Sequence, residues 1–475
     1  MNIKRFTGYE FIQGVVLTIV LLAATACGAT APTAQAPAPT EAAAPTEAAA
    51  APATEEAAAP TEAPAEAAAS TEEAAPAVEG AGKPIVIAVT TDLGTIEGQS
   101  SLNSVMMAVE EINAAGGVNL GGEMQPFEVV STDTRDGSPD VPVDDALQSM
   151  ERLILEEKPA AIVVGNLRSE VLIAAMDLMA KYKLPYLGSI AASPAMQQKV
   201  TEDYDTYKYV FRVGLNGPGV GMYLTQAMGF LNQQFDFKRA YIVHQDVAWA
   251  KGTADGLEKW FQGNGWEVVG KDPYPTGATE FTPSLNQAIQ GEADVIVPIF
   301  DMPSSGILLK QAKAMQAPAL FAGFISPVAP PGAWDTFEGE VDGMVNLSFE
   351  IGNLPVKAVP ASAEYFNKYG KKYGPEALTT LGGHAPAPSY DSVYVLKEAI
   401  ERAGSLEGDA LVKALEATDY EGVMGRIRFG KDHQVVFGLD PKETALGAVF
   451  QWQDGQRVPV FPPAIAEGEI KLPSQ

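Results

Sequence analysis

The chain has 475 residues, a net charge of −28 and a single cysteine, Cys27. A surface this acidic repels the phosphates of nucleic acids, so we exclude DNA and RNA as partners. One thiol cannot form a disulfide within the chain, so we expect side-chain packing to supply the stability of the fold.

The first 27 residues have the order of an export signal. Lys4 and Arg5 precede the apolar run 15–24, and Ala24-Thr25-Ala26-Cys27 follows it. The last four residues resemble a bacterial lipobox, in which the cysteine is lipidated and becomes the first residue, although Ala24 stands where Leu is commonest. An uncleaved membrane helix is the alternative, but the apolar run is short for the roughly 20 residues that a span needs. We therefore expect 1–27 to be a lipoprotein signal peptide that ends at lipidated Cys27.

Residues 28–82 consist almost wholly of Ala, Pro, Thr and Glu. They contain nine Glu and no Lys or Arg. Such a segment has little apolar surface to bury and its charges repel, so we predict a disordered linker that holds the folded body away from the membrane.

The remaining residues, 83–475, are too many for one ordinary core, so two domains are expected. Removing the nine linker glutamates and the net +1 of the first 27 residues leaves a charge of about −20 on this body. β-rich runs alternate with helical patterns along it, which favours parallel sheets covered by helices on both faces. The pattern starts afresh near Leu215, as expected for two such domains.

The predicted elements follow in chain order. We expect strands at 85–89, 127–130, 161–164, 185–188, 210–213, 240–243, 266–269, 295–300 and 320–321. We expect helices at 102–112, 142–157, 171–182, 219–230, 251–262 and 304–315.

Ligands of doubly wound sheets bind beyond the carboxyl ends of the strands. Six loops lie there in this chain, whatever its function: 90–99, 165–169, 188–194, 244–250, 300–303 and 323–327.

The usual signatures of catalysis and cofactor binding are absent from the sequence. The three histidines, His244, His384 and His433, are far apart, and no nucleophile elbow or phosphate-binding loop occurs. We therefore expect no enzyme activity, no catalytic residue, no metal site and no cofactor.

Five segments resemble the type I periplasmic binding proteins of branched-chain amino acid ABC transporters, the leucine/isoleucine/valine-binding group. The first is Ala-Val-Glu-Glu-Ile-Asn-Ala-Ala-Gly-Gly-Val at 108–118, and the others follow in family order at 209–212, 274–281, 390–404 and 449–452. The likeness runs from Pro84 to about Val458.

The resemblance implies an α/β fold of two Rossmann-like lobes, each with a parallel central sheet, joined by three crossovers that act as the hinge of a Venus flytrap. The crossovers map near 213–216, 323–327 and 438–444. The first lobe then comprises 83–212 plus 328–437, and the second comprises 213–326 plus 438–475.

The resemblance also implies ligand-binding positions. Leu167, Arg168 and Ser169 match the loop that offers a hydroxyl and helix-start N–H groups to a ligand carboxylate. Ser169 is equally suited to capping the helix. The guanidinium of Arg168 would clamp a carboxylate if it pointed inward and would be merely solvated if it pointed outward. Trp249 falls where the family places an aromatic side chain against the ligand.

The chain departs from the family pattern at two positions that hold an α-ammonium group. Ala191 and Ala192 occupy a loop that usually carries a Thr hydroxyl, and Ile325 aligns with the acid that pairs with the ammonium. An unpaired buried ammonium costs several kcal/mol. Either another acid substitutes, with Glu97, Asp246 and Asp301 as candidates, or the ligand has no α-ammonium.

The resemblance, together with the lipid anchor expected at Cys27, implies a monomeric, extracytoplasmic, membrane-anchored solute-binding protein that delivers a small organic solute to an ABC permease. The solute could be like a branched-chain amino acid, an amide or an organic acid. A lipoprotein of the same fold that reports ligand to a receptor or kinase is the first alternative, and an enzyme on this scaffold is a remote one.

Overall fold

The computed structural model describes residues 82–473. Among these residues, no helix combines the length and the apolar character needed to cross a membrane. Cys27, the proposed signal peptide and the proposed linker lie outside the described part, apart from Gly82.

The first sheet has five parallel strands in the order β4-β1-β5-β6-β7. Their bounds are β1 Ile85–Thr91, β4 Phe127–Asp133, β5 Ala161–Val164, β6 Tyr186–Gly188 and β7 Val210–Arg212. The central strand β5 is buried along its whole length, as expected for a β-branched run that is covered by helices on both faces. A small hairpin of β2 (Val118–Leu120) and β3 (Glu123–Gln125) stands apart from the sheet.

The second sheet has seven strands in the order β16-β15-β12-β11-β10-β8-β9. It is parallel from β9 to β12, and β15 and β16 add an antiparallel edge. The bounds are β8 Arg239–Gln245, β9 Glu267–Tyr274, β10 Val295–Phe300, β11 Leu320–Ile325, β12 Val345–Ser348, β15 Ala448–Gln453 and β16 Gln456–Phe461.

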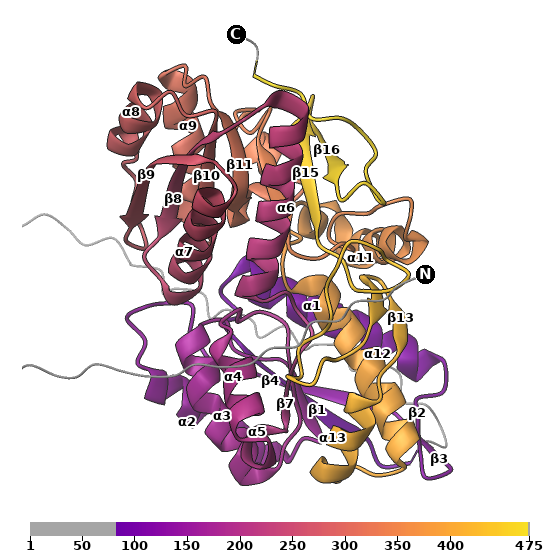
Figure 1. Cartoon of the computed structure of the whole chain (residues 1–475). Helices are drawn as coiled ribbons and strands as arrows, with labels where there is room; N and C mark the ends of the chain where they lie inside the picture. Colours follow the sequence, from indigo (N-terminus) through magenta and orange to yellow (C-terminus); the bar gives the residue numbers. More distant parts are fainter. Residues whose placement is uncertain (1–81, 474–475) are drawn as a thin grey trace, which may run out of the picture. The chain divides into compact units, whose positions relative to one another are not determined.

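Helices cover both sheets, and Figure 1 shows α6 and α7 beside the strands of the second sheet and α1 and α12 beside the first. The helices that precede β8 are α1 Ile96–Ala114, α2 Val143–Glu157, α3 Ser169–Tyr182, α4 Ala195–Glu202, α5 Tyr204–Tyr207 and α6 Gly217–Phe235. Those that follow are α7 Ala248–Gly263, α8 Thr282–Gln290, α9 Ile307–Ala314, α10 Ala333–Thr336, α11 Pro360–Thr379, α12 Pro386–Ala403 and α13 Gly408–Glu416, with short 3-10 turns η1 Pro303–Gly306 and η2 Ser326–Val328. A second hairpin pairs β13 (Tyr420–Gly422) with β14 (Gly425–Ile427).

The chain passes between the sheets three times, at 213–216, at 349–359 and at 438–447. The predicted fold class, two parallel-sheet lobes with a three-crossover connection, is confirmed. The position of the second crossover at 323–327 was wrong, and so was the assignment of 328–348 to the first lobe. Because β12 pairs in parallel with β11, the chain stays in the second sheet until Ser348. The other lobe boundaries stay a prediction.

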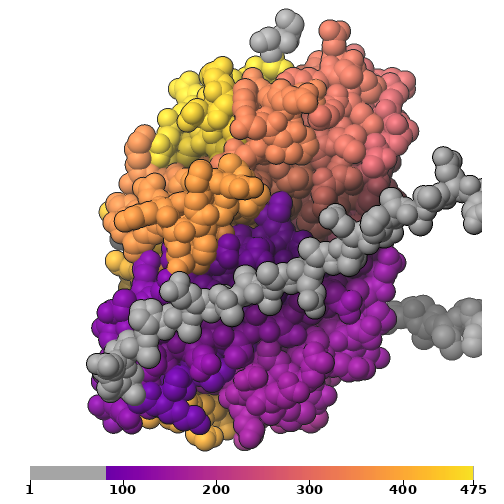
Figure 2. All heavy atoms as spheres, turned by 180° about the vertical axis from the view of Figure 1, so that it is seen from behind, coloured from indigo at the N-terminus to yellow at the C-terminus, as the bar shows by residue number. Residues whose placement is uncertain are grey.

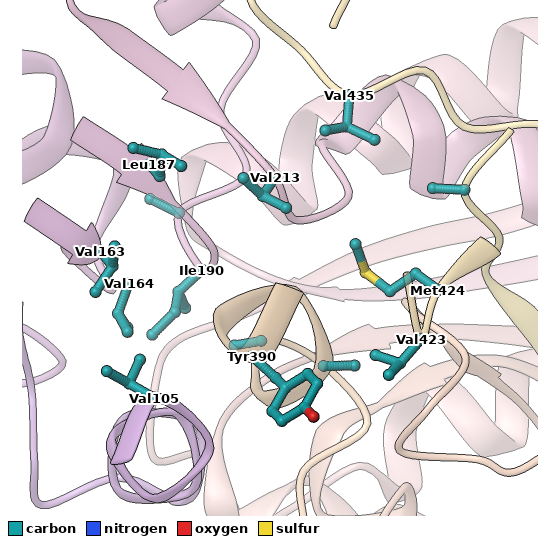
Figure 3. Packing of buried hydrophobic residues seen from close by; sticks show 14 of the residues in the cluster. Val105, Val163, Val164, Leu187, Ile190, Val213, Tyr390, Val423, Met424 and Val435 are labelled. Atoms are coloured by element: carbon teal, nitrogen blue, oxygen red, sulfur yellow. The ribbon is translucent and has the colours of Figure 1, made fainter. Parts of the chain in front are cut away.

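A hydrophobic cluster fills the space where the first sheet meets α1, α12 and the β13–β14 hairpin. Figure 3 shows Val163 and Val164 of β5 near Val105 of α1 and near Ile190. Figure 2 gives the opposite face, with the N-terminal part of the described chain in indigo and magenta below the later residues in salmon, orange and yellow. The loops at the strand ends therefore rest on tightly packed supports.

Candidate functional site

A cleft of about 690 Å³ lies between the carboxyl ends of the two sheets. Each of the six loops singled out from the sequence contributes residues to its lining. Seven of the nine proposed ligand-binding residues line it, namely Glu97, Leu167, Arg168, Ser169, Ala192, Trp249 and Asp301, and so does Asp246. The volume falls within the range of small-molecule sites in proteins.

The loop that enters α3 is held by one buried carboxylate. Asp136 accepts the N–H groups of Leu167 and Arg168, each at 3.0 Å, and the hydroxyl of Thr134 at 2.6 Å. Burial raises the pKa of Asp136 above its usual value, although these hydrogen bonds oppose the shift. The carboxylate thus fixes the backbone directly before Ser169.

The Arg168 guanidinium is engaged by the protein itself. It donates to the carbonyl oxygens of Ser138 and Val141 at 3.0 and 2.9 Å. These bonds tie the loop before α2 to the start of α3. The guanidinium is therefore a brace between two loops, which neither of the two sequence-based alternatives foresaw.

Ser169 is the first residue of α3, and the helix start has no side-chain cap. Its hydroxyl oxygen instead accepts the N–H of Ser193 at 3.2 Å. The first N–H groups of a helix have no intrahelical partner, so the start of α3 offers donors to the cleft. The capping role that the sequence left open is not seen.

In the second lobe, Trp249 and Asp301 form a pair. The indole N–H of Trp249 donates to Oδ2 of Asp301 at 2.6 Å, and the ring meets Phe324 edge-on at 5.9 Å between centroids. Gln245 supports the pair, because its Oε1 accepts the N–H groups of Asp301 and Met302, each at 3.1 Å.

The Asp301 side chain lines the cleft and is exposed to it, but the surrounding walls limit its contact with bulk water. The resulting loss of solvent raises its pKa to about 6, and the nearby carboxylate of Glu97 adds to the shift. Glu97 itself reaches across the cleft, because its Oε1 accepts the hydroxyl of Ser326 at 2.5 Å. Acids of the two lobes thus face one another in the cleft.

Two predicted site residues do not line the cleft. Ile325 is fully buried, and its N–H donates to Asn346 in β12 at 2.8 Å, while its neighbours Phe324 and Ser326 reach the cleft. Alternation along β11 explains this, because successive side chains point to opposite faces. Ala191 is buried and donates its N–H to the carbonyl of Asn166 at 3.2 Å.

Sequence reasoning missed several lining residues. Gln245, Ser326, Phe349 and His384 all contribute to the cleft. Gln245 and Ser326 belong to the loops 244–250 and 323–327 at the carboxyl ends of strands, so their positions in the sequence could have identified them. Phe349 and His384 lie in segments whose path depends on the second crossover, and no local pattern marked them.

The arrangement offers hydrogen-bond donors at α3, carboxylates at Glu97 and Asp301, and an aromatic wall at Trp249. Among residues 82–473, no three His, Cys, Asp or Glu side chains are grouped so as to hold a metal ion. These groups suit recognition of a small solute by polar groups at its ends and apolar contacts between them.

Comparison with known proteins identifies the family. The family model described as periplasmic binding protein matches residues 84–456, so the chain belongs to that family. The Leu/Ile/Val-binding protein homolog 7 of Brucella melitensis is 25% identical over 388 residues, covering 79% of this chain and 90% of the relative.

Two solved structures share the fold. A putative branched-chain amino acid ABC transporter protein from Silicibacter pomeroyi superposes with a TM-score of 0.70 at 19% identity, over 82% of this chain and 99% of the other. An ABC transporter solute-binding protein from R. palustris, in complex with benzoate, gives a TM-score of 0.63 at 15% identity, over 81% and 98%.

Proposed function

We propose that the protein is the lipid-anchored, extracytoplasmic solute-binding subunit of an ABC importer. Its solute is a small organic molecule that is trapped in the cleft when the two lobes close. One observation carries the proposal: seven of the residues proposed for binding line one cleft at the carboxyl ends of both sheets. Membership of the periplasmic binding protein family supports it.

The chemical class of the solute follows from the cleft lining. The start of α3 and the Ser169 hydroxyl suit a carboxylate or another acceptor, and Trp249 suits a flat or apolar body. Glu97 or Asp301 would pair with an ammonium group, in place of the acid missing at Ile325. Both amino acids and aromatic acids are candidate solutes, because relatives are named for leucine, isoleucine and valine and one neighbour was solved with benzoate.

A thermal-shift screen of the purified protein tests the proposal. The set should contain branched-chain amino acids, benzoate and other organic acids, and amides, with calorimetry on any hit. We expect at least one of them to raise the melting temperature, because a ligand that binds only the folded state stabilises it. Turnover of an amide or ester, or a screen without any hit, would count against a binding protein for such solutes.

A matched pair of variants locates the site. Trp249→Ala should weaken binding of the hit by about tenfold or more, since it removes a large contact surface and the donor to Asp301. Trp260→Ala is the control, because Trp260 lies on the same helix and does not line the cleft. Equal affinity in the two variants would remove Trp249 from the binding site.

A further inference from the structure

One buried carboxylate joins two of the three crossings. Glu350 lies at the start of the second crossing and is fully buried. Its Oε1 accepts the N–H of Leu215 in the first crossing at 2.8 Å, and its Oε2 accepts the N–H of Ala385 before α12 at 3.2 Å. The carboxylate therefore joins two of the crossings to each other, and it joins both of them to the loop before α12 in the first lobe.

His384 completes this arrangement with both ring nitrogens. Nδ1 lies 3.1 and 3.2 Å from the two carboxylate oxygens of Glu350, and Nε2 lies 2.7 Å from the carbonyl oxygen of Ile190. A carbonyl can only accept, so Nε2 carries a proton. Both oxygens of Glu350 already accept a backbone N–H group and lie within hydrogen-bond distance of Nδ1, so we assign Nδ1 as a donor as well. The ring is then an imidazolium paired with a buried carboxylate.

We propose that Glu350 and His384 form a proton-dependent hinge lock. While His384 is charged, the pair holds the first two crossings at a fixed angle on the first lobe. When the ring loses its proton, one donor is lost and the angle between the lobes becomes free to vary. The inference rests on the proposed function, because an interlobe angle matters only if the lobes close on a solute.

The lock lies next to the cleft. His384, Ile190 and Phe349 all line it. The centroid of the Phe349 ring lies 4.5 Å from that of the His384 ring and 6.2 Å from that of the Trp249 ring. Phe349 directly precedes Glu350, so a solute resting on this wall touches residues that position the lock. Binding and the state of the lock are then coupled, and the coupling is reciprocal.

The charged groups around His384 determine the direction of the pH effect. Burial by itself lowers the pKa of the His384 ring, but Glu350, the Ile190 carbonyl and the more distant Glu97 outweigh it, so the pKa is raised above its usual value. Asp301 faces the ring from the second lobe, and Tyr223 of α6 lies near Glu350. A raised pKa means that the lock is complete below about pH 6.5 and is lost as the pH rises through the higher value.

A second histidine–carboxylate pair serves as a matched control. His433 Nε2 lies 3.1 Å from Oε1 of Glu416, and its Nδ1 lies 3.2 Å from the carbonyl oxygen of Val210. Glu416 belongs to α13 and Val210 to β7, so this pair joins only elements packed on the first sheet.

The experiment measures the angle between the lobes without any ligand. Spin labels are placed at Glu157→Cys at the end of α2 and at Gln290→Cys at the end of α8, both exposed, in the full chain carrying Cys27→Ser. Pulsed electron paramagnetic resonance should give a narrow distance distribution at pH 6 that broadens toward pH 9. Glu350→Gln should be broad at every pH, whereas Glu416→Gln should keep the parent profile.

Nuclear magnetic resonance of the three histidine rings tests the charge itself. We expect His384 of the parent to titrate above the ordinary histidine range, and its pKa to fall by about 1–3 units in Glu350→Gln. His384→Gln, which cannot carry the charge, gives a second variant with an expected broad distribution if Glu350→Gln does not fold.

Two results would overturn the lock. One is a Glu350→Gln or His384→Gln distribution that matches the parent in width and pH response, and the other is a parent His384 that titrates at or below the ordinary value. A different result would contradict the proposed function. In that case no solute in the screen would change the distance between the spin labels, while the response of that distance to pH would remain.

Discussion

At the scale of single residues, the turn after β5 shows backbone strain beside the cleft. Val164 has φ 78° and Gly165 has φ 74°, and positive φ is unusual for a β-branched residue. The hydroxyl of Tyr186, in the neighbouring strand β6, accepts the N–H of Asn166 at 2.8 Å and holds the turn in place. Strained turns persist where the surroundings fix them, and this one aims the loop that carries Leu167 to Ser169.

Gly165→Ala should therefore be strongly destabilising. A Cβ at this position would lie 1.9 Å from the Tyr186 hydroxyl, and it would also add strain at positive φ. We expect a loss of about 1–3 kcal/mol in the free energy of unfolding, measured by denaturant titration. Gly122→Ala is the control, since φ is 101° but no atom lies within 4 Å. If the two variants lost the same stability, the contact with Tyr186 would not matter.

Asp301→Asn should make the protein more stable at neutral pH and weaken its ligand binding. The pKa of Asp301 is raised to about 6, so its ionisation costs stability as the pH rises from about 4 through 6. The amide removes that dependence, and we expect a gain of about 1 kcal/mol at pH 7 after allowing for water in the cleft. Unfolding free energies of both proteins at pH 4 to 8 check this. If the unfolding free energies of the two proteins changed with pH in parallel, the predicted gain in stability would be wrong.

The family resemblance and the strand-end positions predicted seven residues that line the cleft, but not the orientation of their side chains. Trp249 and Asp301 were each identified separately, yet only the structure shows them hydrogen-bonded to one another. Arg168 was expected to face a ligand or water, whereas two backbone carbonyls hold it. The partners of a side chain depend on loops distant in sequence, and spacing along one loop does not reveal them.

At the scale of elements, a buried acid anchors the β13–β14 hairpin. Asp391 of α12 accepts the N–H groups of Val423 and Met424 at 3.0 and 3.2 Å, and burial raises its pKa to about 7. The hairpin turn lies against the helix in the hydrophobic cluster of Figure 3. The carboxylate satisfies donors that would otherwise be buried without partners.

Asp391→Ala should loosen this hairpin. It leaves two buried N–H groups unsatisfied, which costs about 2–4 kcal/mol. Hydrogen exchange should accelerate at 422–425, and the midpoint of unfolding should fall. Ser392→Ala is a matched control, because the next residue is equally buried but bonds only to Pro388 in its own helix. Unchanged exchange at 422–425 would show that packing alone holds the hairpin.

Elements with a strong hydrophobic pattern were predictable, and those defined by tertiary context were not. The runs at β1, β5 and β10 are apolar and buried, so they were found with nearly correct bounds. β12 reads Val-Asn-Leu-Ser, which has too weak a pattern to be recognised alone. It is a strand because β11 and β15 lie on either side of it. The crossover mapped from the family resemblance at 323–327 therefore fell one strand too early.

At the scale of the whole molecule, the three crossings determine how the angle between the lobes, and with it the width of the cleft, can change. A cleft between two sheets can close only through changes in the crossings, because each sheet is packed as a unit. Glu350 lies in one crossing and bonds to another, so a change at one is transmitted to both. The Glu97–Ser326 contact, in turn, joins the lobes directly across the cleft.

The proposed lipid anchor would hold the binding protein beside the permease, and the last prediction concerns its attachment through Cys27. Cys27→Ser should move the protein from the membrane fraction to the soluble extracytoplasmic fraction, because lipid attachment needs the thiol and a hydroxyl does not replace it. Fractionation with immunoblotting, together with the mass of the N-terminal peptide, measures both location and lipid. Ala26→Ser, which keeps the thiol and a small residue before it, should stay membrane-bound. A Cys27→Ser protein that stays in the membrane would favour the uncleaved helix, whose attachment depends on the apolar run 15–24 and not on one sulfur atom.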